Sequence, residues 1–227
     1  NNALKLGYDP QVLKYPDWLM ALDISPWLPR VLAPGAAIAP IQANVAKRFG
    51  LPLSCIIKTG TTDSIAAFLA SGASAMGEGV TSLGSTLVLK LLSPVAINDA
   101  PSGIYSHRLG QHWLAGGASN TGGAVLHQYF NDQELSSLSP LIDIAYPSGL
   151  DYYPLLKAGE RFPINDPALV PRLTPRPTDS VKFLHGLLEG MARIEALGYQ
   201  ILTDLGSGLV NRVYTAGGGA KTATWQA

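Results

Sequence analysis

The feature that most constrains the fold is a long amphipathic segment at about 180–205 that leads straight into an apolar run with β-strand character. Its apolar side chains recur near helical spacing, at Leu184, Leu187, Leu188, Met191, Leu197, Ile201 and Leu205. Gly206 is placed to cap this helix, and 210–215 then forms a strand that enters Gly217-Gly218-Gly219. A long helix, a strand and a glycine turn in this order favour an α/β protein.

The rest of the chain alternates short helices and strands. We predict helices at 17–22, 41–49, 63–70 and 120–130, and strands at 53–57, 79–83, 87–92, 104–109, 112–115 and 152–156. The strand at 53–57 is expected to be buried, and 131–179 to be mostly loop. The pattern changes between Gly72 and Gly79, so we place one domain at 1–75 and a second at 76–227.

Composition excludes several classes of function. Apolar residues make up 47% of the 227 residues and charged residues 14%, which is a globular composition. Lys and Arg together number 16, as do Asp and Glu, and this balance argues against a nucleic-acid partner. No apolar run is long enough to cross a membrane. The single cysteine, Cys55, is expected to be a buried small hydrophobe and fits a reducing compartment.

The first candidate site is Thr59-Gly60-Thr61-Thr62-Asp63-Ser64. It places the carboxylate of Asp63 in the first turn of a predicted helix, where free N–H groups and the helix dipole favour the ionised form. A helix cap would explain an aspartate here. The functional alternative is a base that takes the proton of an attacking hydroxyl, as phosphoryl transfer requires.

Two glycine-rich turns form the second candidate site. Gly84-Ser85-Thr86 lies between two apolar β-type runs, where glycine and hydroxyl groups can bind phosphate oxygens or simply make a turn. Gly217-Gly218-Gly219 follows a strand and precedes a predicted helix, which permits close approach of a ligand. Neither is a Walker loop or a Gly-x-Gly-x-x-Gly fingerprint.

The histidines and one charged loop receive structural interpretations. His107, His112, His127 and His185 have no metal-ligand spacing, so they are expected to be ordinary surface or core residues, although His127 lies one helical turn after Gly123. Gly159-Glu160-Arg161 is interpreted as a loop with a salt bridge.

Taken together, the motifs resemble the FGGY family of carbohydrate kinases, in the actin, hexokinase and Hsp70 superfamily. The matching pieces, in order, are 6–9, 28–29 with 34–35, 60–64, 82–86, 122–126, 153–156 with 159–161, 188–190, and 217–221. The 1–9 and 84–90 segments are most similar to the small cyanobacterial and plant D-ribulose kinases, which are also described as xylulose-kinase-like.

The resemblance implies two RNase H-like domains: a sugar-binding domain whose C-terminal part is 1–75, and a nucleotide-binding domain at 76–227. It implies a cytoplasmic enzyme, or a plastid one in a plant, that uses ATP and Mg²⁺, with no metal bound by the protein itself. Its substrate would be a ketopentose, with D-ribulose converted to D-ribulose 5-phosphate or D-xylulose as the alternative. Whether the enzyme forms a homodimer is left open.

The resemblance also implies site residues. Asp63 would be the catalytic base and would bind the sugar together with Thr62. The nucleotide residues would be Gly84, Ser85, Thr86, Gly123, His127, Gly218, Gly219 and Thr222.

Three departures from the family pattern bear on function. The family's Asp-x-Gly-Thr phosphate hairpin and most of its sugar pocket are absent, its final helices are missing, and Thr222 replaces an asparagine that contacts adenine. We therefore expect a fragment that lacks both ends of a longer kinase. A nucleotide- or sugar-binding module without catalysis is the alternative if the 227 residues are the whole protein.

Overall fold

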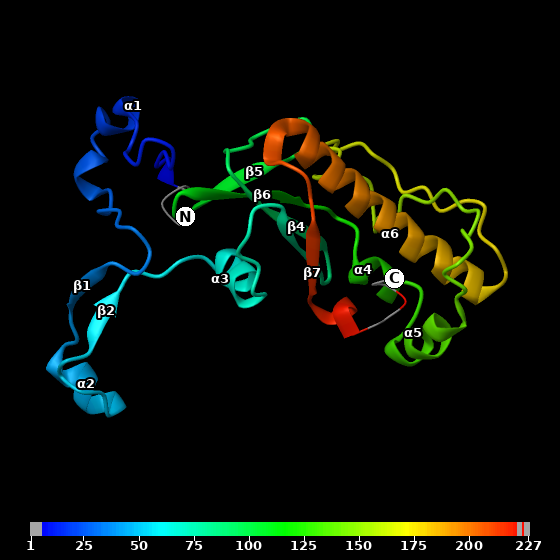
Figure 1. The fold of residues 1–227 in the computed structure, drawn as a ribbon, viewed down its shortest axis with the longest axis horizontal. Coiled ribbons are helices and arrows are strands. Elements are labelled where there is room, and N and C mark those ends of the chain that lie inside the picture. Colours follow the sequence, from blue (N-terminus) through cyan, green and yellow to red (C-terminus); the bar gives the residue numbers. More distant parts are fainter. Residues whose placement is uncertain (1–5, 222–223, 225–227) are drawn as a thin grey trace. The chain divides into compact units, whose positions relative to one another are not determined.

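The computed structural model describes residues 6–221 and Thr224. The chain divides into two compact units, Asn1–Ala67 and Phe68–Ala227 (Figure 1). The division falls inside helix α3 (Asp63–Ala70), a few residues before the change of pattern between Gly72 and Gly79. The assignment of the two parts to a sugar-binding and a nucleotide-binding domain stays a proposal.

Unit 1 is built from short elements. In chain order they are α1 (Asp17–Met20), the 3-10 turn η2 (Ser25–Trp27), β1 (Ala37–Pro40), α2 (Ala43–Phe49), β2 (Ile56–Lys58) and the start of α3. β1 and β2 pair antiparallel in a two-stranded sheet. Gly50 caps α2, and its left-handed φ of 65° lets the N–H of Leu51 donate to the carbonyl oxygen of Ala46 at 2.9 Å. The prediction of a glycine-capped helix here is confirmed.

The predicted buried strand at 53–57 is wrong in both extent and burial. β2 covers only Ile56–Lys58, and all three of its residues are exposed, as are all four of β1. Cys55 is half-buried and not a core residue. An apolar run predicts burial only where a second layer covers the strand, and the described residues of unit 1 leave this ribbon exposed.

Unit 2 contains a five-stranded sheet in the order β5-β6-β4-β3-β7. The strands are β3 (Glu78–Leu83), β4 (Leu87–Ser93), β5 (Tyr105–Leu109), β6 (His112–Ala118) and β7 (Arg212–Ala216). All neighbours pair antiparallel except β3 and β7, which run parallel with Ser82 opposite Ala216. Because parallel strands end at the same edge, the turns that follow β3 and β7 lie next to each other.

Helix α6 (Ser180–Leu202) packs on one face of this sheet (Figure 1). Leu89 and Leu91 of β4 share a core with Ile194 and Leu202 of the helix and with the fully buried Phe162. Asp179 caps the helix by accepting the N–H of Val181. The helix ends at Leu202, and a π-helical turn, η4 (Thr203–Ser207), completes the predicted helical segment.

The segment between the sheet and α6 differs most from the sequence prediction. The helix predicted at 120–130 is only α4 (Gly123–His127). The predicted loop contains α5 (Asp132–Leu138) and a 3-10 turn, η3 (Ser139–Leu141). Asn131 and Glu134 cap the start of α5, because the side chain of each accepts the backbone N–H of the other. The strand predicted at 152–156 is a single bridge between Tyr153 and Arg172.

Candidate functional site

The 84–86 turn joins β3 to β4, and the start of α4 is hydrogen-bonded to it. The N–H of Gly123 donates to the carbonyl oxygen of Gly84 at 2.8 Å, and that of Ala124 donates to Ser85 at 3.1 Å. The N–H of Leu87 donates to the carbonyl oxygen of Thr121 at 2.8 Å. These bonds fix the turn against the loop that enters α4.

Glycine is required where the backbones meet. Gly122 has a φ of 137°, and a Cβ there would lie 2.8 Å from the carbonyl oxygen of Ser85. Gly217 has a φ of 88°, and its Cβ would lie 2.8 Å from the carbonyl oxygen of Leu83. A side chain at 122 would push the loop that enters α4 away from the 84–86 turn, and one at 217 would push the turn after β7 away from the end of β3, which explains the glycines at these two positions.

A cavity of about 990 Å³ opens at this edge of the sheet, within unit 2. It brings together most of the nucleotide residues predicted from the sequence: Gly84, Ser85, Gly123, His127, Gly218 and Gly219. Thr86 is not among the lining residues. Thr222 lies outside the described residues. The volume matches that of sites for drug-sized ligands.

The cavity is lined by backbone and by side chains of two kinds. The glycine turns present backbone, Leu126, Leu135, Pro140, Leu184 and Leu188 contribute apolar side chains, and Ser136 and Ser139 add polar groups. Asp132 also lines the cavity, and its Oδ1 lies 3.7 Å from Nδ1 of His127. Such a cavity can hold a ligand with an anionic end and a flat apolar end. The contribution of α5 and η3 was missed by sequence reasoning, although the Asn131–Glu134 spacing is a capping signal.

Glu160 is a buried carboxylate that the sequence interpretation placed wrongly. Its side chain is buried and makes no salt bridge to Arg161. It accepts the hydroxyl of Ser119 and the N–H of Asn120, both at 2.6 Å, and the N–H of Arg161 at 2.8 Å. Backbone and hydroxyl donors satisfy the charge, so Glu160 fixes the loop that leads into Gly122 and α4.

Asp63 and Thr62 lie in unit 1, at the start of α3. Asp63 is exposed, and its Oδ1 accepts the N–H of Ser64 at 2.8 Å. The carbonyl oxygen of Thr62 accepts the N–H of Ala66, and its Oγ1 lies 3.4 Å from Oγ of Ser64. This is the helix-start geometry that the sequence predicted. Because the cavity belongs to unit 2, the role of Asp63 as a base stays a prediction.

Two searches of the described residues complete the description of the site. No three His, Cys, Asp or Glu side chains among them gather as a metal site. Within residues 6–221, no helix has the length and apolar character needed to cross a membrane.

No protein-family model matches the sequence, but solved structures do match the fold. A xylulose kinase from Rhodospirillum rubrum aligns with a TM-score of 0.82 and 22% identity, over 99% of this chain and 48% of that one. A kinase from Brucella ovis described as a xyloylose kinase aligns with a TM-score of 0.80 and 21% identity, over 94% of this chain and 46% of that one. Plasmodium falciparum glycerol kinase with ADP aligns with a TM-score of 0.77 and 14% identity, over 97% of this chain and 46% of that one.

The chain thus spans about half the length of these kinases. At these identities the likeness concerns the fold alone, and it confirms the predicted α/β class: this chain has the fold of about half of each of these chains. The D-ribulose kinase subgroup stays a prediction.

Proposed function

We propose that this chain is part of an ATP-dependent carbohydrate kinase that phosphorylates a hydroxyl group of a ketopentose. D-Ribulose, giving D-ribulose 5-phosphate, is the first candidate substrate, and D-xylulose is the alternative. The observation that carries the proposal is the cavity at the ends of β3 and β7, which is lined by two glycine turns and by apolar side chains. A fold shared with sugar kinases, one of them with ADP, supports it.

In this proposal the two units have separate chemical roles. ATP supplies the γ-phosphoryl group, and Mg²⁺ accompanies its phosphates. In the proposal, the 84–86 turn holds phosphate oxygens with backbone N–H groups and hydroxyls. Gly123, His127, Gly218 and Gly219, which also line the cavity, hold the nucleoside. Thr222 belongs to the same predicted set, and Thr62 and Asp63 face the sugar.

The transfer step is a displacement at phosphorus. As the hydroxyl oxygen of the sugar bonds to the γ-phosphorus, its proton passes to the carboxylate of Asp63, and the bond from phosphorus to the β,γ-bridging oxygen breaks to release ADP. The transition state is loose, so positioning contributes more than base strength. An exposed aspartate at a helix start meets that modest demand.

The test uses the natural polypeptide that contains these residues. ADP release is measured by a coupled assay with D-ribulose, D-xylulose, glycerol and gluconate, and ADP binding is measured by calorimetry. We expect ketopentose-stimulated turnover. Binding of ADP without turnover on any sugar would instead favour a non-catalytic nucleotide-binding module, and the absence of both would reject the proposal.

Asp63→Asn tests the base. The change keeps the size of the side chain and an acceptor for the N–H of Ser64, but removes the proton acceptor. We expect kcat to fall by about 10²-fold or more with ADP affinity unchanged. Asp23→Asn, at another exposed aspartate of unit 1, is the control. Normal turnover in Asp63→Asn would show that the base assignment is wrong.

A further inference from the structure

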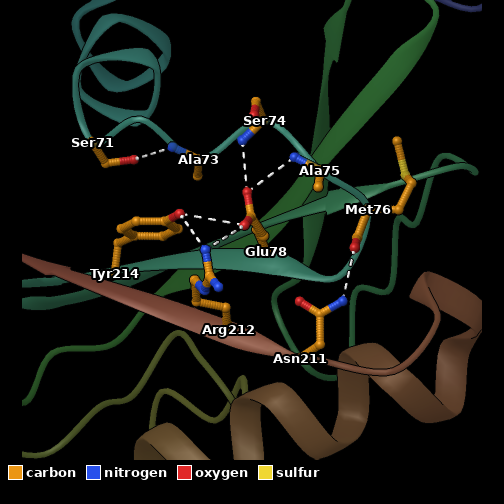
Figure 2. A network of polar contacts seen from close by, with 9 residues as sticks. All are labelled: Ser71, Ala73, Ser74, Ala75, Met76, Glu78, Asn211, Arg212 and Tyr214. Atoms are coloured by element: carbon orange, nitrogen blue, oxygen red, sulfur yellow. Dashed lines mark hydrogen bonds and ion pairs between the residues drawn. The ribbon is translucent and has the colours of Figure 1, made fainter.

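The connection between α3 and β3, residues 71–77, is bound by a buried glutamate. Figure 2 shows Glu78, the first residue of β3, with its carboxylate turned back toward this connection. Oε2 accepts the N–H of Ser74 at 2.8 Å and that of Ala75 at 3.0 Å. The side chain is 10% exposed. One carboxylate oxygen thus accepts hydrogen bonds from the backbone of the connection.

The other carboxylate oxygen binds the neighbouring parallel strand. Oε1 of Glu78 lies 3.4 Å from Nη1 of Arg212 and 3.3 Å from the hydroxyl of Tyr214, both on β7 (Figure 2). Arg212 also donates to the Tyr214 hydroxyl at 3.3 Å. Glu78 therefore joins the α3–β3 connection to the two strands that lead into the 84–86 and 217–219 turns.

Asn211 adds a second set of bonds to the same connection. Its Nδ2 donates to the carbonyl oxygen of Met76 at 3.1 Å, and its N–H donates to the carbonyl oxygen of Gly77 at 2.9 Å. Gly77 has a φ of 80°, and a Cβ there would lie 2.4 Å from the carbonyl oxygen of Leu209. The connection is therefore a fixed piece of unit 2.

The charge of Glu78 is suited to this role. The N–H groups of Ala75 and Ser74, more than the hydroxyl of Tyr214 and the charge of Arg212, lower the pKa of its carboxyl. The carboxylate is therefore ionised at neutral pH, and its bonds to the backbone are charge-assisted.

We propose that Glu78 is a positioning residue for phosphoryl transfer, because it holds the α3–β3 connection to the strands that carry both glycine turns. α3 is one continuous helix: Asp63 is its first residue, and the 71–77 connection follows directly after its last residue. Releasing the connection lets the C-terminal end of α3 move, and the carboxylate at its other end moves with it. The inference rests on the proposed function, since it concerns the alignment of Asp63.

The test compares Glu78→Ala and Glu78→Gln in the natural polypeptide, with turnover divided by the ADP-binding stoichiometry so that misfolded protein is not counted. We expect Glu78→Ala to lower kcat by about tenfold or more while KM for ATP stays within about twofold, since misalignment affects the transition state. Glu78→Gln, which keeps one acceptor oxygen, is expected to recover part of kcat.

Hydrogen exchange gives a readout that does not depend on activity. The Ser74 and Ala75 amides should exchange faster in Glu78→Ala, while those of β3 at 80–83 keep their protection. Asp99→Asn is the matched control, because Asp99 also accepts a backbone N–H and a hydroxyl, both from Ser102. It should change exchange at Ser102 and leave kcat and the 71–77 amides as they were.

The outcomes distinguish failure of the positioning role from failure of the kinase proposal. Unchanged exchange at Ser74 and Ala75 would show that Glu78 does not hold the connection. Faster exchange at Ser74 and Ala75 with a wild-type kcat would show that the bonds of Glu78 to the connection do not position the base. A wild-type protein without sugar-dependent turnover would reject the kinase proposal and the positioning role together, whereas normal turnover in Asp63→Asn would reject only the base assignment and what rests on it.

Discussion

At the residue scale, Lys90 is a buried amine whose surroundings bear on stability. It alternates along β4 with Leu89 and Leu91, which pack toward α6, so its side chain lies on the opposite face of the sheet. The residue is 5% exposed, and its Nζ lies 4.3 Å from the centre of the Tyr105 ring and 3.4 Å from Nδ1 of His107. No carboxylate among the described residues pairs with this amine.

Burial sets the protonation of this pair. It lowers the pKa of Lys90 to about 8, and burial together with the charge of Lys90 lowers the pKa of His107 to about 4. His107 is therefore neutral near pH 7, and Nδ1 can accept from the lysine. Because the unfolded lysine has an ordinary pKa of 10.5, the unfolded chain binds more protons between pH 8 and 10.5, and the free energy of unfolding rises with pH across that window.

Lys90→Met should remove this dependence. It replaces the buried amine with an apolar side chain of similar length and should raise the free energy of unfolding at pH 7 by up to about 3 kcal/mol, the equivalent of the shift in pKa. Urea unfolding of both proteins at pH 7 and pH 10 measures it, and the difference between them should shrink at pH 10. Lys182→Met, at an exposed lysine of α6, should change little. An equal difference in the free energy of unfolding at both pH values would contradict the lowered pKa of Lys90.

Residues whose role is set by neighbours in the chain could be predicted, and those set by distant partners could not. The glycine at 84 and the helix-start aspartate at 63 follow from local turn and capping preferences. Glu160 could not be placed, because its donors at Ser119 and Asn120 are about forty positions away. For the same reason, the sequence does not reveal that Glu78 meets Arg212.

At the element scale, α6 shows what periodicity predicts and what it misses. The apolar spacing predicted a long helix with its core face, and the helix is present. It did not explain the three glycines, Gly186, Gly190 and Gly198, on a helix where each costs about 1 kcal/mol relative to alanine. Each lies against a close neighbour: a Cβ on Gly190 would lie 2.8 Å from the carbonyl oxygen of Tyr152, and one on Gly198 would lie 2.5 Å from Cζ of Phe162.

Gly198→Ala should therefore destabilise the chain despite the better helix propensity of alanine. We expect a net loss of about 1–2 kcal/mol, because Phe162 is fully buried and overpacking outweighs the gain in propensity. Urea unfolding measures it. Ala196→Gly, at an exposed position of the same helix, gives the propensity effect alone, and Phe162→Leu in the Gly198→Ala background should restore part of the loss. If Gly198→Ala were more stable than the wild type, the Phe162 ring would have to move aside at little cost in free energy.

At the scale of the whole molecule, the two units differ in how completely they bury their apolar residues. Unit 2 has continuous cores between the sheet, α4 and α6. Unit 1 leaves Trp27 at 86%, Leu53 at 66% and Trp18 at 65% exposed. The fold class could be predicted because the order of the motifs along the chain reflects the order of the elements in the fold. The exposure of the strand at 56–58 could not be predicted, because burial depends on a second layer that the local pattern does not contain.

The location of the cavity in unit 2 predicts that ADP binds this unit without help from unit 1. Hydrogen exchange with and without ADP should show slower exchange at 84–87, 121–127 and 131–141, and unchanged exchange at 59–63. At an ADP concentration about 100 times Kd, the free energy of unfolding of unit 2 should rise by about 2.7 kcal/mol. Gly123→Val, whose Cβ would lie 2.9 Å from the carbonyl oxygen of Gly84, should abolish both effects. Protection at 59–63 equal to that at 84–87 would instead mean that unit 1 forms part of the nucleotide site.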